Sequence, residues 1–280
     1  MKISVVIPVF NSVDLLRRCL ESLQAQWPPD AEVIVVDNGS SDGAATMVRR
    51  DHPGIRIIQN EKNEGAARAR NQGIEASRGS WVLTLDCDVV LKAHFFDEIL
   101  NAIQGAAPRT GMIQAKILKD DSDAIFSTGI RLTPLRRLVD RGLGQKDRGQ
   151  FDELLEIFGP CSAAAAYRRS MLDEVKDAFG YFDERFFFLV EDVDLAWRAQ
   201  RAGWKAAFSP KSVCAHRGDS SKTNGPLRQY YCFRNRRWML EKNERFPGRV
   251  RNFLLSPFYD APRRLYLFLT NPYFKALPHG

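Results

Sequence analysis

The sequence predicts an α/β fold whose N-terminal third is built from βαβ units around a parallel sheet. Through about residue 90, short apolar segments alternate with segments of helical periodicity, as in strands followed by crossover helices. The apolar segments are short and rich in β-branched residues, which is typical of strands buried on both faces. Beyond this point the pattern changes, so we expect a second half of different construction.

The elements of the first half follow one another closely. Strands are predicted over residues 3–7, 32–36, 55–58 and 81–85. Helical spacing follows the first strand, with Asn11 or Ser12 as the expected N-cap and an apolar stripe of Leu15, Leu16, Cys19, Leu20 and Leu23. An Ala- and Arg-rich helix is predicted over residues 65–76.

The second half mixes strands, helices and irregular segments. Strands are predicted over residues 112–118, 160–167, 204–208 and 213–216. Helices are predicted over residues 95–103, 171–178 with Ser170 as cap, 191–203 and 227–244. Residues 133–150 are rich in Arg, Gly and Lys with little periodicity, which predicts a mobile loop. The tail, residues 253–277, combines aromatic, proline and basic residues.

Composition narrows the class of protein without choosing a ligand. A hydrophobic content of 44% and a charged content of 27% are ordinary for a soluble globular protein. The net charge of +7 fits a phosphate-bearing substrate, an anionic membrane or nucleic acid. The five cysteines are scattered, and no CxxC pair indicates zinc or redox chemistry. With no signal-peptide pattern and no apolar run long enough to span a membrane, we expect a cytoplasmic protein.

Two aspartates at the end of the fourth predicted strand are the first candidate site. In an extended chain, residues two apart point to the same side, so Asp86 and Asp88 can converge while Cys87 points away. Paired carboxylates at the carboxyl end of a strand suit a hard divalent cation. The alternative is a solvated turn that happens to be acidic.

Two further segments are candidates for binding a nucleotide. Asp37 follows a buried strand and could accept a hydrogen bond from a base or ribose, although an Asn-Gly turn alone explains the segment. Arg68 or Arg70, at the start of a helix, could reach a diphosphate, or could be solvated. Neither GxGxxG nor GxxxxGK[ST] occurs, so dinucleotide binding and P-loop chemistry are poorly supported.

Acidic, histidine and basic-aromatic residues complete the candidates. Glu191 and Asp192 open a predicted helix, where acids act as caps or, alternatively, as a general base for an incoming hydroxyl. His216 ends a predicted strand and is either structural or a ligand. The helix around residues 230–238 could bind phosphates, nucleic acid or a membrane face, or could simply pack.

Five motifs in order carry a resemblance to a known family. They are residues 5–11 (VVIPVFN), 35–43 (VVDNGSSDG), 63–71 (NEGAARARN), 85–89 (LDCDV) and 190–198 (VEDVDLAWR). Together they closely resemble the inverting family-two glycosyltransferases, and most of all the bacterial rhamnosyltransferase-like branch that builds cell-surface polysaccharides. The resemblance covers roughly residues 2–240.

The resemblance implies a GT-A fold and a division of the chain. A Rossmann-like nucleotide-sugar-binding half, residues 1–90, would be fused to a mixed-sheet acceptor half, residues 91–225, to make one catalytic domain over residues 1–225. Residues 226–280 would form a helical, aromatic and basic C-terminal extension.

The resemblance also assigns roles to residues at matching positions. The donor sugar nucleotide would contact Pro8, Val9, Phe10, Asn11, Asp37, Asn63, Gly65, Arg68, Arg70, Asp86 and Cys87. A divalent cation, Mg²⁺ or Mn²⁺, would be bound chiefly by Asp88, with Asp86 and His216 beside it. Asp192 would be the base, and Glu191 would touch acceptor or donor. Ser220 or Ser221 would lie near His216, where the chain departs from the family's Gly-Gly by having Arg217, Gly218 and Asp219.

The implied activity is metal-dependent, inverting transfer of a hexose, such as rhamnose, to a hydroxyl of a glycan or lipid-linked acceptor. The expected donor is a dTDP- or UDP-sugar. A sugar nucleotidyltransferase would instead need a glycine-rich phosphate loop at residues 8–11, and a non-catalytic binding protein of the same fold would be expected to lack Asp192. Expected partners include the inner membrane surface and a second copy, but no nucleic acid. The loop at 133–150, or the segment after His216, is expected to close over the donor.

Overall fold

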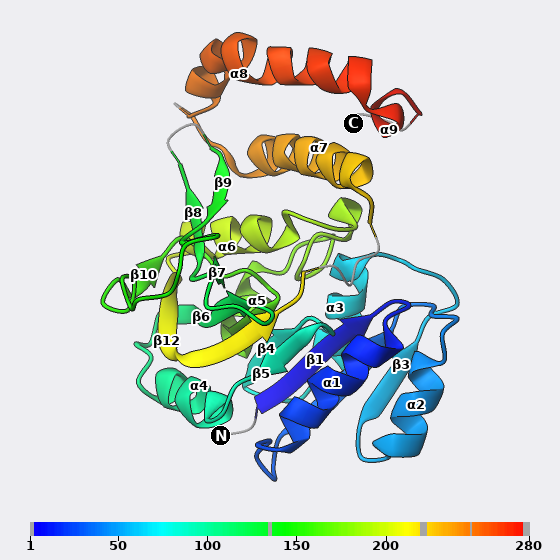
Figure 1. The fold of residues 1–280 in the computed structure, drawn as a ribbon. Helices are drawn as coiled ribbons and strands as arrows, with labels where there is room; N and C mark the ends of the chain where they lie inside the picture. The colour runs from blue at the N-terminus through cyan, green and yellow to red at the C-terminus, as the bar shows by residue number, and fades with distance from the viewer. Residues whose placement is uncertain (1–2, 134–135, 219–222, 247, 277–280) are drawn as a thin grey trace.

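The four N-terminal strands form the parallel half of one large sheet. The computed structural model describes residues 3–133, 136–218, 223–246 and 248–276. Strands β1 (Ile3–Val9), β2 (Glu32–Asp37), β3 (Arg56–Gln59) and β4 (Trp81–Leu85) pair in parallel in the order β3-β2-β1-β4. Helices α1 (Val13–Gln24), α2 (Ala44–Asp51) and α3 (Ala66–Ala76) connect them (Figure 1). The strand order reverses between β1 and β4, and ligands of open α/β sheets bind at such a point.

The second half extends the same sheet beyond β4 with mixed strand directions. Strand β11 (Ala164–Arg168) is antiparallel to β4 and to β6 (Thr110–Lys119), and β12 (Lys205–His216) is parallel to β6. Shorter strands β5 (Val89–Leu91), β7 (Ile125–Ser127) and β10 (Glu156–Ile157) pair at its margins. The α/β class and the mixed second half predicted from the sequence are therefore confirmed.

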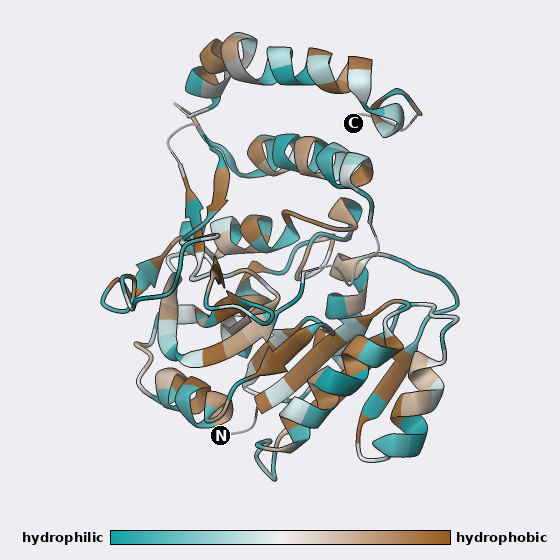
Figure 2. Cartoon of the chain, viewed as in Figure 1, coloured by the Kyte–Doolittle hydropathy of each residue, from teal (hydrophilic) through white to brown (hydrophobic). Residues whose placement is uncertain are grey.

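Two apolar layers cover the faces of the sheet. One layer joins β1, β2 and β4 to α1, α2 and α4 (Phe95–Gln104). The other contains side chains of α3, α5 (Arg169–Val175) and α6 (Glu191–Arg201). The hydropathy colouring shows hydrophobic residues along the strands that lie between the helices (Figure 2). Burial of both faces explains why the parallel strands read as continuous apolar runs.

Three sequence-based expectations about local structure are wrong. Ser170 does not cap a helix, because α5 begins at Arg169 and ends at Val175, where a tight turn over residues 177–180 stops it. The strands expected at 204–208 and 213–216 are one strand, β12, whose register shifts between Ser209 and Val213. The first helix does begin after Ser12, but the Val13 N–H is capped by the carboxylate of Asp42 instead of by the Ser12 hydroxyl.

The expected loop at 133–150 contains a strand. Strand β9 (Leu138–Asp140) pairs with β8 (Ile130–Leu132) in an antiparallel hairpin. Three residues are too few to show alternation, so only the pairing partner reveals the strand. Arg141 then donates hydrogen bonds to the backbone oxygens of Thr128 and Leu154, which ties the hairpin to its neighbours. Residues 134–135 lie outside the described part of the chain.

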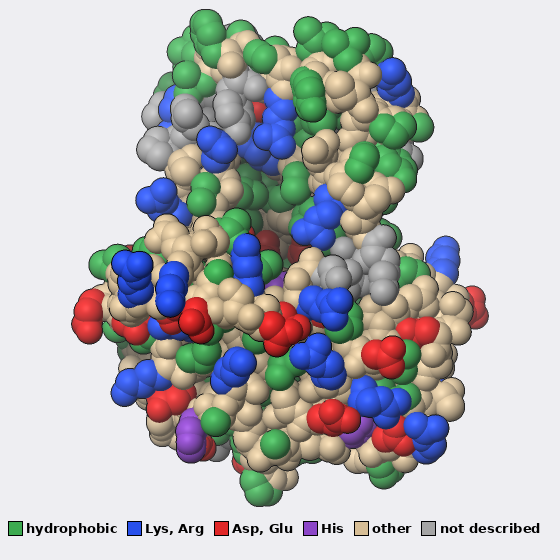
Figure 3. All heavy atoms as spheres, in the orientation of Figure 1, with side chains coloured by type: hydrophobic (Ala, Val, Ile, Leu, Met, Phe, Trp, Pro, Cys, Tyr) green, Lys and Arg blue, Asp and Glu red, His purple; other side chains and the backbone are tan. Residues whose placement is uncertain are grey.

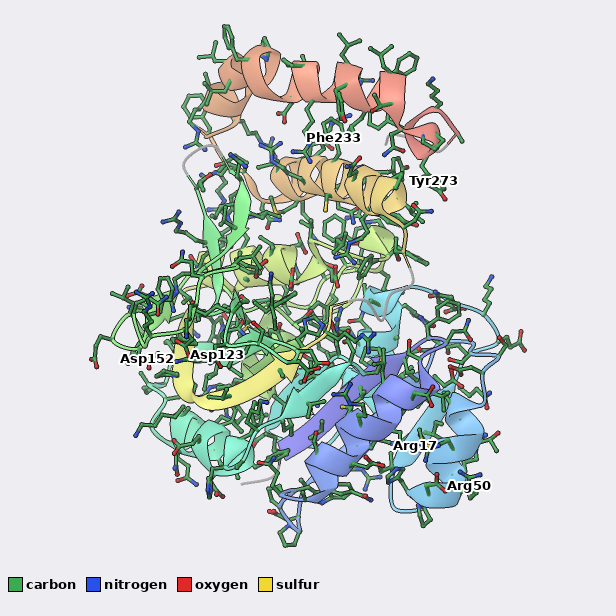
Figure 4. All side chains as sticks on the ribbon, in the orientation of Figure 1. Arg17, Arg50, Asp123, Asp152, Phe233 and Tyr273 are labelled. Carbon is green, nitrogen blue, oxygen red and sulfur yellow. The ribbon has the colours of Figure 1, made fainter. Side chains whose placement is uncertain are left out.

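Helices form the C-terminal region, as predicted. Helix α7 (Gly225–Asn243) contacts α6, and α8 (Gly248–Thr270) and α9 (Pro272–Ala276) lie on its far side (Figure 1). Phe233 of α7 packs between these helices against Leu267 and Phe274 (Figure 4). Within the described ranges, none of the helices has both the length and the apolar character needed to cross a membrane.

Candidate active site

Two aspartates and a histidine converge just beyond the carboxyl end of β4. His216 Nε2 lies 3.1 Å from Asp88 Oδ1 and 3.7 Å from Asp86 Oδ2. The potential ligand atoms of the three side chains all lie within 4.8 Å of one another. The backbone at this point is not extended, because β4 ends at Leu85 and the Val89 N–H donates to the Asp86 carbonyl. A turn, rather than strand alternation, brings the two carboxylates together, while Cys87 packs into the core.

This cluster has the donor chemistry of a divalent-cation site. Asp88 is buried, and its Oδ2 accepts a hydrogen bond from the Gly218 N–H at 2.9 Å. Burial lowers the pKa of His216, but Asp88 and Asp86 together raise that pKa above its ordinary value. The two carboxylates thus favour positive charge at the imidazole position. The two carboxylates supply the oxygen ligands that Mg²⁺ and Mn²⁺ prefer, and the imidazole is a third potential ligand, so the residues present fit the expected ion.

Arg70 links this cluster to the acids at the start of α6. Its Nη2 lies 2.7 Å from Asp86 Oδ1, and its Nη1 lies 2.6 Å from Glu191 Oε1. Arg70 is almost fully buried; burial lowers its pKa, while Asp86 and Glu191 raise it above the ordinary value. Breaking such a buried pair by removing one partner is strongly destabilising. Arg70 therefore holds two carboxylates from distant parts of the chain in one place.

Asp192 lies beside this network with its carboxylate fixed by the backbone. Its Oδ2 accepts from the Ser162 N–H at 3.2 Å, and its Oδ1 accepts from the Val193 N–H at 2.8 Å. Burial raises the pKa of Asp192, and the nearby charge of Asp86 raises it further, although the two backbone N–H groups and Arg70 oppose this. A carboxylate with a raised pKa is a better proton acceptor than an ordinary aspartate.

The raised pKa of Glu191 predicts that the stability of the protein depends on pH. Burial raises its pKa from 4.5 to about 7, although Arg70 opposes the shift. Protonated Glu191 therefore stabilises the folded chain relative to the unfolded chain. This stabilisation is complete below about pH 4.5 and is lost as the pH rises through about 7. Between about pH 5 and pH 8 we therefore expect the wild type to lose more unfolding free energy than Glu191→Gln, which has no charge to titrate at this position. Urea denaturation measures this difference; identical pH profiles for both proteins would refute it.

A strained segment leads into α6 and positions both acids. Phe187, Leu189 and Val190 have φ angles of 65°, 70° and 76°, a region that non-glycine residues rarely occupy. On one side the Phe187 carbonyl accepts from the Ala66 N–H at 2.7 Å. Gly65 is required there, because a Cβ at this residue would lie 2.6 Å from that carbonyl oxygen.

Asn235 of α7 holds the same segment from the other side. Its buried amide nitrogen lies 3.0, 2.8 and 2.7 Å from the carbonyl oxygens of Phe186, Phe188 and Leu189. Helix α7 therefore supports the backbone that directly precedes Glu191 and Asp192. Sequence reasoning missed Asn235, since one asparagine within a basic-aromatic helix carries no local signal.

Two adjoining cavities share Arg70, Asp86 and Phe188 in their walls. The larger cavity has a volume of about 350 Å³, and its polar lining includes Glu191, Asp192 and His216. The smaller cavity has a volume of about 90 Å³. Besides Arg70 and Asp86, six further residues expected from the resemblance line it: Pro8, Val9, Phe10, Asn63, Gly65 and Cys87. Residues from both ends of the predicted motif series thus meet at one place.

Three expected donor-binding residues do not line these cavities. Asn11 accepts a hydrogen bond from the Ser41 N–H at 2.8 Å. Asp37 is buried; its Oδ1 accepts from the Ser40 N–H, and its Oδ2 has no hydrogen-bond partner within the described ranges. Arg68 pairs with Glu184 at 3.0 Å on the surface. The expected positions Asp219, Ser220 and Ser221 fall outside the described residues.

Two residues that the sequence did not single out contribute to the walls. Asp140 of β9 lines the larger cavity, and burial raises its pKa to about 6. Asn38 lines the smaller cavity, where its amide donates to Asn63 Oδ1 at 2.9 Å and to the Gly65 carbonyl at 3.1 Å. Asp140 was hidden in the expected loop, and Asn38 was read as a turn residue.

Comparisons with known proteins identify relatives of this chain. The family model described as Glycosyl transferase family 2 matches residues 4–176. The pre-mycofactocin glycosyltransferase of Mycobacterium tuberculosis is 31% identical over 221 residues, 76% of this chain and 42% of that protein. The N-acetylglucosaminyl-diphospho-decaprenol L-rhamnosyltransferase of the same organism is 26% identical over 241 residues, 75% of this chain and 74% of that protein. The chain thus spans less than half the length of the first of these relatives.

Solved structures show the same fold. The mannosyltransferase PcManGT from Pyrobaculum calidifontis, in complex with GDP-Man and Mn²⁺, matches with a TM-score of 0.62 and 21% identity, over 97% of this chain and 71% of that chain. GalNAc-T7 with UDP, GalNAc and Mn²⁺ matches with a TM-score of 0.66 and 16% identity, over 100% of this chain and 52% of that chain. The GT-A fold expected from the sequence is confirmed.

Proposed function

Because the chain belongs to glycosyl transferase family 2, we propose that it transfers a sugar from a nucleoside-diphosphate donor to an acceptor hydroxyl, with a divalent cation and with inversion. One observation supports this most directly. The Asp86, Asp88 and His216 cluster, the Arg70 bridge and the acids of α6 meet where the two cavities adjoin. A non-catalytic binding protein would not require the buried acids Glu191 and Asp192 at this point.

The donor would bind with its diphosphate at the metal cluster. Asp88, Asp86 and His216 would hold Mg²⁺ or Mn²⁺, which would neutralise charge on the departing diphosphate. The smaller cavity, between Pro8, Phe10 and Cys87, would accept the nucleoside. Two solved relatives with this fold contain a nucleotide and Mn²⁺, which supports the assignment.

Asp192 would act as the base. Its carboxylate would accept the proton of the acceptor hydroxyl as that oxygen attacks the anomeric carbon and the bond to the diphosphate breaks. A single displacement of this kind inverts the anomeric centre. Arg70 would keep Glu191 and Asp86 in place, so that base and diphosphate lie on opposite sides of the sugar.

The names of the relatives and the extent of the motifs support a proposal on donor and acceptor. We propose a dTDP- or UDP-sugar as donor, with rhamnose the favoured hexose, and a glycan or lipid-linked acceptor of cell-surface polysaccharide synthesis, since one relative is named as a rhamnosyltransferase acting on a diphospho-decaprenol-linked sugar. Residues 1–90 would serve the donor and residues 91–225 the acceptor, with 226–280 as an extension.

A third cavity would lie on the path of the acceptor. It has a volume of about 200 Å³ and shares Leu138, Val190 and Cys232 with the larger cavity. Farther along, Arg137, Arg236 and Arg263 line it. Guanidinium groups bind phosphate well, so an acceptor carrying phosphate fits this wall.

The test is a calorimetric titration with a panel of nucleoside diphosphates, with and without Mg²⁺ or Mn²⁺. We expect one nucleotide to bind only with metal, and Asp88→Asn to weaken that binding at least tenfold, on the order of the loss when a metal ligand's support is removed. Asp147→Asn is the matched control. Asp147 is not part of the metal cluster, and its Oδ2 lies 3.0 Å from Lys116 Nζ. Absence of binding for every nucleotide with either metal would refute the donor site.

A further inference from the structure

The outer face of α8 is the most apolar exposed surface of the described chain. Four exposed large hydrophobic side chains are scattered elsewhere, at Leu143, Leu154, Leu155 and Phe179. The other eight lie in one segment, at Phe246, Val250, Leu254, Phe258, Leu265, Tyr266, Phe268 and Leu269. In the space-filling view, hydrophobic side chains gather over α8 (Figure 3). Contiguous patches of this kind mark interaction sites.

These side chains share one face of the helix. At 3.6 residues per turn, the positions from Val250 to Leu269 fall within an arc of about 160°. Phe258, near the centre of this arc, is 83% exposed. The opposite side faces α7, where Leu267 is buried and Asp260 pairs with Arg236 at 2.6 Å. Helix α8 therefore has a fixed inner face and an uncovered apolar outer face.

Positive charge borders this apolar face. Arg263 and Arg264 fall on opposite sides of the arc, and both are exposed. Lys275 of α9 lies near the ring of Phe268, with its nitrogen 5.8 Å from the ring centroid. Residues 245–276 contain six Lys or Arg and one Asp, so this segment carries a net charge of +5, most of the chain's +7.

We propose that the outer face of α8 binds the surface of an anionic phospholipid bilayer. An exposed apolar face flanked by basic residues is the pattern of a helix that lies in the membrane interface, with its apolar side chains among the acyl chains and its cations at the headgroups. A second copy of the chain is a poorer occupant, because two such segments would bring like charges together. The surface lies outside the donor site and would bind lipid whether or not the chain transfers sugar.

The position of α8 also suggests a role for lipid binding in acceptor recognition, and this role rests on the proposed function. The third cavity has Asp260 and Arg263 of α8 in its wall and leads to residues that also line the larger cavity. A recess between the upper helices and the body is visible at this level (Figure 3). An acceptor whose lipid is anchored in a bilayer on the outer face of α8 would therefore reach Asp192 through a cavity lined by arginine residues.

Co-sedimentation of the full chain with vesicles tests the proposal. One set of vesicles contains phosphatidylcholine alone, and the other contains phosphatidylcholine and phosphatidylglycerol in equal amounts. We expect strong binding only to the anionic vesicles, and at least tenfold weaker partitioning for the triple variant Leu254→Ser, Phe258→Ser, Leu265→Ser. The control, Leu143→Ser, Leu155→Ser, Phe179→Ser, removes three exposed hydrophobic side chains of the same residue types from other surfaces and should bind as the wild type does.

Further variants separate charge, folding and self-association. Arg264→Gln with Lys275→Gln should weaken binding several-fold on anionic vesicles. Thermal unfolding and nucleotide binding of the α8 variant should match the wild type, so that loss of lipid binding is not loss of the fold or of the donor site. The proposal fails if the wild type ignores anionic vesicles, if the triple variant still binds them, or if the only change is from dimer to monomer in solution.

Discussion

Asp192→Asn should lower the rate of sugar transfer by roughly a hundredfold to ten-thousandfold, the usual contribution of a general base. The amide has nearly the shape of the carboxylate, and its oxygen can still accept one of the two backbone N–H hydrogen bonds, from Ser162 or Val193. It cannot take the proton of the acceptor hydroxyl. Because Asp192 is not one of the three clustered potential metal ligands, we expect binding of the donor nucleotide to stay within about threefold of wild type, below roughly 1 kcal/mol.

Asp140→Asn is the matched variant for this prediction. Asp140 lines the same cavity and also has a raised pKa, to about 6, so it is the alternative proton acceptor. Single-turnover transfer and calorimetric nucleotide binding should be measured for both variants. If Asp140→Asn abolished transfer and Asp192→Asn did not, Asp140 would be the base; if neither reduced transfer, the proposed mechanism would be wrong.

Asn235→Ala should reduce the rate of transfer by about a hundredfold, the cost of a misplacement near 1 Å at a reacting centre. The substitution leaves the carbonyl groups of Phe186, Phe188 and Leu189 without their shared donor. The positive φ angles of this segment persist only while surrounding contacts enforce them. Relaxation would move Glu191 and Asp192, which directly follow the segment, although the Asn235 amide donates to the segment and not to these acids.

Asn243 of the same helix is the matched control. It is equally buried, and its amide donates to Asp194 Oδ1 at 2.6 Å and to the Met239 carbonyl, but to none of the carbonyl groups that Asn235 holds. Asn243→Ala should destabilise the protein by a similar amount, on the order of 1–3 kcal/mol for buried groups left unpaired. Below the unfolding temperature it should keep a rate within about threefold of wild type, below roughly 1 kcal/mol of barrier.

The readout must separate positioning from stability. For Asn235→Ala we expect kcat to fall while the KM for the donor changes little, and the pH profile of kcat to shift because Asp192 and Glu191 change surroundings. Equal losses of activity in the Asn235 and Asn243 variants would show that helix α7 contributes stability only.

Much of the fold was predictable because its information is local. The runs at residues 3–7 and 81–85 are strands buried on both faces, and such burial demands consecutive apolar residues. The prediction of a mobile loop at 133–150 was wrong because the information that makes a strand there is not local. Strand β9 has three half-buried residues and becomes a strand only by pairing with β8.

The candidate site divides in the same way. By itself, the sequence determined the chemical groups: two aspartates after β4, two acids opening α6, a histidine ending β12 and an arginine in α3. Only the tertiary structure decided which of them meet. Arg70 rather than Arg68 faces Asp86 and Glu191, because the side chains of a helix turn about 100° per residue and α3 buries just one of the two positions. Asp140 and Asn235 joined the site from a hairpin and a C-terminal helix, since contacts between distant segments arise from packing and leave no pattern in the neighbouring residues.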